Sequence, residues 1–167
     1  MKHRTQTVVL TIVLILGFLS AQSLAGNSVN APKFSASAIQ IEPMDPGDVP
    51  MPPEFRVAIY ENLIQQIEKT QKFQHVYRSG DKDATSVPDL VTLRTTAQSF
   101  KKGSQKKREV TTVAGSSSIS LKVHITDHAG QTLVDRDVEG KVRFFGENLR
   151  VTYNFSKRVA SIVRDTF

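Results

Sequence analysis

The sequence contains no cysteine and no tryptophan among its 167 residues. Without cysteine, no disulfide can hold a small core together and no thiol can accept a lipid. The largely apolar run Val8–Leu19 has 12 residues. A membrane-spanning helix needs about 20, so this run is too short to be one. We therefore expect a domain held together by core packing alone, with no permanent transmembrane span once the chain has been processed.

The N-terminus has the order of features that is typical of a secretory signal peptide. Lys2 and Arg4 precede the apolar run, and Ser23-Leu24-Ala25 follow it as a small-residue ending. This order predicts a signal peptide over residues 1–25, a flexible leader over residues 26–33 and a single domain over residues 34–167. The protein is then exported, and it is periplasmic or peripherally attached to the cell envelope without being lipidated.

The positive charge of the chain is concentrated in one short segment. The formal net charge is +6, and removal of residues 1–25 leaves 20 basic against 16 acidic residues, a net of +4. Because an exported chain rarely meets nucleic acid, the high pI does not predict a nucleic-acid partner. The segment contains Lys101, Lys102, Lys106, Lys107 and Arg108. Clustered charge of this kind suits an anionic lipid or glycolipid surface or an acidic envelope protein, although it is also typical of a solvated hairpin end.

Hydrophobic periodicity predicts seven elements in the order β-α-β-β-β-β-α. Strands are expected over residues 34–42, 73–78, 88–100, 119–126 and 132–145, since their apolar positions alternate or run continuously. Amphipathic helices are expected from Pro53–Glu54 onward and after Asn148, with Ile59, Leu63, Phe155 and Val159 facing the sheet. The fold class is therefore α+β, a five-stranded, largely antiparallel or mixed sheet with two helices packed on one face.

Two groups of residues could support chemistry. Asp135, Asp137 and Glu139 alternate along one strand, which fits either a paired-carboxylate hydrolase or charge pairs with Lys122 or His124 across the sheet. A metal site at His124 and His128 is not expected, because four residues of extended strand span about 13 Å. No activated nucleophile and no cofactor motif is present, so we expect a protein that is not an enzyme, with the hydrolase as the alternative.

Residues 34–165 resemble an uncharacterised family of exported bacterial envelope proteins and lipoproteins. The resemblance depends on Asp89-Leu90-Val91, Phe100–Ser104, Arg108, Ile119–Val123 and a set of turn residues, namely Gly103, Gly115, Asp127, Gly130 and Gly140. The element order is also distantly similar to the periplasmic domain of the curli-secretion lipoprotein and the N-terminal domain of the Tol-system propeller protein. These resemblances imply a binding or assembly module of unknown partner. This chain departs from the family in lacking a lipidated cysteine and in having a shortened glycine-rich segment at residues 113–116.

Overall fold

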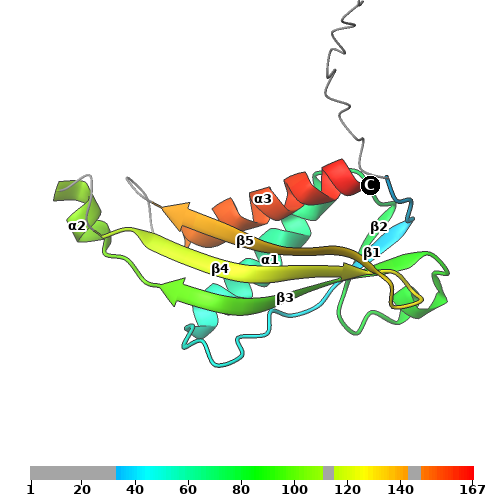
Figure 1. Cartoon of the computed structure of the whole chain (residues 1–167), viewed down its shortest axis with the longest axis horizontal. Helices are drawn as coiled ribbons and strands as arrows, with labels where there is room; N and C mark the ends of the chain where they lie inside the picture. The colour runs from blue at the N-terminus through cyan, green and yellow to red at the C-terminus, as the bar shows by residue number, and fades with distance from the viewer. Residues whose placement is uncertain (1–32, 111–114, 143–147) are drawn as a thin grey trace, which may run out of the picture.

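A computed structural model describes residues 33–110, 115–142 and 148–167 (Figure 1). The predicted signal peptide and residues 26–32 of the predicted leader lie outside the described residues. The elements are the strands β1 (Ala38–Ile41), β2 (His75–Arg78), β3 (Leu90–Lys101), β4 (Ser117–Thr126) and β5 (Thr132–Val142), the α-helices α1 (Pro53–Glu68), α2 (Gln105–Val110) and α3 (Arg150–Thr166), and a 3₁₀ helix at Lys82–Ser86.

The five strands form one mixed sheet in the order β2-β1-β3-β4-β5. β1 pairs in parallel with both β2 and β3, whereas β3, β4 and β5 pair antiparallel. The predicted α+β class and the order of the seven elements are therefore confirmed. Two short helices were not predicted: residues 82–86 were expected to be an irregular connection, and residues 105–110 to be part of a turn.

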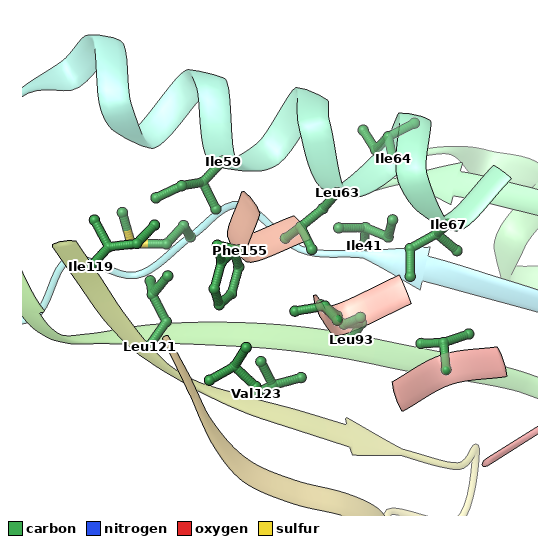
Figure 2. Packing of buried hydrophobic residues seen from close by; sticks show 14 of the residues in the cluster. Ile41, Ile59, Leu63, Ile64, Ile67, Leu93, Ile119, Leu121, Val123 and Phe155 are labelled. Atoms are coloured by element: carbon green, nitrogen blue, oxygen red, sulfur yellow. The ribbon is translucent and has the colours of Figure 1, made fainter. Parts of the chain in front are cut away.

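The core lies between the helices and one face of the sheet. Long strands contribute every second side chain to it, because successive side chains of a strand point to opposite faces. Figure 2 shows Ile59 and Leu63 of α1 and Phe155 of α3 above Leu121 and Val123 of β4. Ile59, Leu63, Phe155 and Val159 are all fully buried, so the predicted helix faces are confirmed.

The two long helices also bond to each other. The side-chain amide of Asn62 on α1 donates to the hydroxyl of Thr152 on α3 at 2.9 Å. α1 begins at Pro53, whose missing N–H costs nothing in the first turn of a helix. α1 is also bonded to β2: the Arg78 guanidinium of β2 donates two hydrogen bonds to the Glu61 carboxylate of α1, at 2.7 and 2.8 Å.

β1 is buried on both faces, as the absence of polar alternation in residues 34–42 predicted. Ile39 and Ile41 point into the main core, while Ala38 packs with Ala84 and Leu90 in a second small cluster. Ala84 belongs to the unpredicted 3₁₀ helix, which covers the second face of β1. The strand itself is shorter than predicted, since the ladder begins only at Ala38.

Candidate functional site

The basic segment lies at one end of the molecule, beyond the paired parts of β3 and β4. In Figure 1, α2 projects from the strand ends away from the helix layer. Lys101 is the last residue of β3, Lys102 follows it, and Lys106 and Lys107 belong to α2. All four lysines are exposed. Arg108 is also part of α2, but its side chain lies outside the described part of the structure.

The segment that links the two strands contains the short helix α2 (Gln105–Val110), where the sequence predicted a turn. We call residues 101–110 the basic tip. Besides the four lysines it presents Val110, a residue that is 82% exposed. A single exposed apolar side chain is ordinary on a protein surface, but here it shares a protruding helical turn with clustered positive charge. The basic tip therefore offers an anionic surface both charge and a small apolar group.

A close backbone contact joins the two chain segments at the base of the basic tip. The Ser104 N–H donates to the carbonyl oxygen of Gly115 at 2.9 Å, and the Gly103 N–H donates to the Ser117 hydroxyl oxygen at 3.1 Å. A Cβ added to Gly103 would lie 2.2 Å from the Gly115 oxygen, and Gly115 has a φ of 90°, which favours glycine. Gly103 and Gly115 thus help to fix where the tip emerges.

The opposite end of the sheet carries the predicted turn between β4 and β5. The Asp127 carboxylate accepts a hydrogen bond from the Gln131 N–H at 2.8 Å, and Gly130 takes a positive φ of 83°. Next to the turn lies an open pocket of about 420 Å³, whose lining includes Phe34, Asp89 and His128. Asp89 is held in place by Ser37, which donates to it from both its backbone N–H and its hydroxyl.

The acidic strand residues point away from the helices, onto the open face of the sheet. The Lys122 ammonium donates to Asp135 at 2.8 Å, His124 Nδ1 lies 3.5 Å from the same carboxylate, and Lys141 pairs with Glu139 at 2.6 Å. The side-chain amide of Gln98, the extra residue of a β-bulge in β3, donates to Asp137 at 2.7 Å. The predicted pairing with Lys122 and His124 is confirmed. Each acid therefore has a neutralising or donating neighbour on an exposed face, and this arrangement gives no support to the hydrolase alternative.

The Lys122–Asp135 pair leads to a pH prediction. The hydrogen bond from Lys122 holds the pKa of the Asp135 carboxyl below its ordinary value of 3.8. A lowered pKa in the folded state means that the stabilisation is complete above the ordinary pKa and is lost as the pH falls through the lower, folded-state pKa. A carboxyl carbon NMR titration should therefore give Asp135 a midpoint below 3.8, and Lys122→Gln should raise that midpoint. Equal midpoints in the two proteins would contradict the pairing.

Within residues 33–110, 115–142 and 148–167, no group of three or more His, Cys, Asp or Glu side chains is placed to hold a metal ion. The same described ranges contain no helix that is both long and apolar enough to cross a membrane.

Gly140 has a packing role. It lies on β5 directly below α3, where an added Cβ would be 2.5 Å from the Val151 carbonyl oxygen and 2.8 Å from Cβ of Phe155. Hydrogen in place of a side chain lets the helix approach the strand closely. The Asn154 amide donates to the Lys141 carbonyl oxygen at 2.8 Å and fixes the same contact.

These features define an α+β domain with one open sheet face, a helix layer and a basic tip. No protein-family model matches the chain, and no curated protein matches it either. The family resemblance of the sequence, and its likeness to the curli and Tol proteins, therefore stay predictions.

Solved structures do share the fold. The PelC dodecamer from Paraburkholderia phytofirmans is 9% identical over 78% of this chain and 92% of that chain, with a TM-score of 0.59. A variant of the same dodecamer is 8% identical over 81% of this chain and 93% of that chain, with a TM-score of 0.58. A DUF330 protein from Xanthomonas campestris is 12% identical over 79% of this chain and 86% of that chain, with a TM-score of 0.49. At these identities the likeness to PelC concerns the fold alone.

Proposed function

We propose that this chain is a non-catalytic, exported cell-envelope domain that acts as a binding or assembly module and docks on anionic surfaces through its basic tip. The observation that carries the proposal is the placement of the tip: four exposed lysines and the exposed Val110 protrude together from the end of the sheet. Clustered cations attract an anionic membrane surface, with about 1 kcal/mol for each Lys or Arg near it.

The hydrogen bonds at the base of the tip support this proposal. Because Gly103 and Gly115 are in backbone contact, the lysines project from a defined position. The Ser117 hydroxyl, which accepts from Gly103, also donates to Asn148 Oδ1 at 2.9 Å, next to the start of α3. A charged surface that is fixed to the body of the domain can orient the whole domain on a membrane.

Two sequence and fold features support the envelope and assembly parts of the proposal. The predicted signal peptide would provide export, and the two PelC structures that share the fold are described as dodecamers. An assembly role for this chain can be examined by light scattering of the protein purified after export. A discrete oligomer would support it, and a monomer at all concentrations would restrict the proposal to binding.

The basic tip makes a direct prediction about vesicle binding. Replacing Lys101, Lys102, Lys106, Lys107 and Arg108 together by Gln should abolish sedimentation with phosphatidylglycerol vesicles, while the melting temperature stays nearly unchanged because exposed charges add little stability. Binding of the wild type should weaken as salt shortens the Debye length from about 10 Å at 0.1 M. The measurement is co-sedimentation at low and high salt, with phosphatidylcholine vesicles for comparison.

A second variant with the same loss of charge serves as the control. It carries Gln at five exposed basic positions away from the tip, namely Lys33, Lys82, Arg94, Arg136 and Arg158. This control should keep most of the vesicle binding. If the two variants bind alike, net charge rather than the tip attracts the protein, and the docking proposal is wrong.

Turnover of a sugar or ester by the wild type, lost in Asp137→Ala, would favour the hydrolase instead.

A further inference from the structure

A small groove lies between the two long helices, along the C-terminal part of α1 and the C-terminal half of α3. It has a volume of about 120 Å³, and Gln66, Lys69, Lys157 and Arg164 are among its lining residues. A water molecule occupies about 30 Å³ of the liquid, so the groove can hold a group of several heavy atoms. It is formed by residues of the helix layer, whereas the basic tip belongs to the β3–β4 connection.

Three cations surround this groove. Lys69 follows the end of α1, and Lys157 and Arg164 are seven residues, about two turns, apart along one side of α3. Arg164 Nη2 donates to Ser161 Oγ at 3.0 Å, which holds the guanidinium beside the groove. The Asp165 carboxylate lies 4.0 Å from Arg164 Nε, at the limit of an ion pair, so it neutralises that charge only weakly.

Gln66 supplies an independent observation. The residue is only 7% exposed, and its amide nitrogen Nε2 is buried without a hydrogen-bond partner among the described residues. A buried amide that makes no hydrogen bond destabilises a protein. A half-turn of the carboxamide exchanges its nitrogen and oxygen, so the same side chain can offer its NH₂ group in either direction. Turned toward the groove in this way, the NH₂ group can donate to a ligand that has a free acceptor.

We propose that this groove binds a phosphoryl group, with the Gln66 amide donating a hydrogen bond and Lys69, Lys157 and Arg164 neutralising its charge. A phosphate monoester suits this set better than a carboxylate, because it has more acceptor oxygens and up to two negative charges for three cations and one amide. The planar guanidinium of arginine can also donate two parallel hydrogen bonds to phosphate oxygens. Membrane docking through the basic tip does not require this site.

The proposal can be tested by titrating inorganic phosphate into the exported protein and following backbone amide NMR shifts. Saturable shifts should appear at Thr70, Ala160 and Ser161, which also line the groove. The double variant Lys157→Gln/Arg164→Gln should lose saturation. Its matched control, Arg150→Gln/Arg158→Gln, removes the same charge from the same helix at exposed positions outside the groove lining, and it should bind phosphate as the wild type does.

Gln66→Met separates ligand binding from packing. The substitution keeps a similar volume but removes the buried donor, so it should weaken phosphate binding about tenfold or more without lowering the melting temperature. Shifts that do not saturate in the wild type would overturn the proposal. Unchanged affinity in Gln66→Met, or an equal loss in the control and the double variant, would also overturn it.

A second arm identifies the source of the phosphoryl group. In co-sedimentation with phosphatidic acid vesicles, a lipid-headgroup site predicts that Lys157→Gln/Arg164→Gln weakens vesicle binding while the control does not. A site for free phosphate esters predicts unchanged vesicle binding by the double variant, together with saturable shifts from glycerol phosphate. Because the five-residue tip variant leaves the groove intact, a failure of the tip proposal and a failure of this one give different results.

Discussion

Replacing Phe155 by Ala should lower the free energy of unfolding by about 3–5 kcal/mol, the usual cost of truncating a buried aromatic side chain. Phe155 is among the largest fully buried side chains, with a relative exposure of 0%. It lies where α3 meets the sheet, over Leu121 and near Leu63 of α1 (Figure 2). Urea denaturation followed by circular dichroism measures the loss, and the midpoint should fall without a large change in slope.

The matched control is Tyr153→Ala, two residues earlier on the same helix. Tyr153 is 39% exposed. Among the ring interactions of the described residues, its ring has one, with the Lys157 ammonium nitrogen 5.9 Å from the ring centroid. Loss of the Tyr153 side chain should therefore change the free energy of unfolding far less. Leu63→Ala on α1 should cost about 2–5 kcal/mol for the same reason as Phe155→Ala. If both core variants melt as the wild type does, the assigned helix faces and the layered architecture are wrong.

Gly140→Ala should be the second large effect, although it adds only one methyl group. The new carbon would be 2.5 Å from the Val151 carbonyl oxygen and 3.0 Å from the Phe155 amide nitrogen, and both are backbone atoms that cannot rotate away. α3 would have to shift away from β5. Overpacking of this kind costs about 1–3 kcal/mol and occasionally more, which a thermal melt should detect as a lower midpoint.

Ser118→Ala is the control for that experiment. Ser118 lies on β4, next to the residue that pairs with Gly140, and it points to the open face of the sheet. Its substitution should leave the melting temperature nearly unchanged, because half-exposed sheet positions tolerate small side chains. A Gly140→Ala protein as stable as Ser118→Ala would show that the contact between β5 and α3 is looser than described.

The sequence predicts those parts of the fold that depend on local periodicity. Strict alternation from Ile119 to Ile125 identifies β4, and the four-residue spacing from Phe55 to Ile67 identifies α1, because each pattern repeats over several turns or pleats. The cross-strand partners of Asp135 could also be predicted, since the turn at Asp127–Gly130 sets the register of β4 against β5.

The features that were missed depend on contacts between distant segments. The 3₁₀ helix is short and polar, and only burial of Ala84 against Ala38 reveals its role. The close approach of Gly103 to Gly115 joins two ends of a connection, and the length of that connection does not specify how closely its ends meet. Gln66 and Arg164 are almost 100 residues apart, so their place in one groove follows only from the packing of α1 on α3. The sequence signals were Gly103 within the basic segment, Gly115 after it, and a glutamine on an apolar helix face.

The parallel pairing of β1 constrains the order in which the chain can fold. β1 lies between β2 and β3, and Ala38 is paired with Leu90, 52 positions later. Ribosomes deliver the N-terminus first, so β1 emerges long before its partner strand exists, whereas β3, β4 and β5 can zip together as neighbours. Contacts of large sequence separation form slowly. The antiparallel β3–β5 meander is then the scaffold that captures β1, and until that capture the edge of β1 that will pair with β3 stays open to other chains.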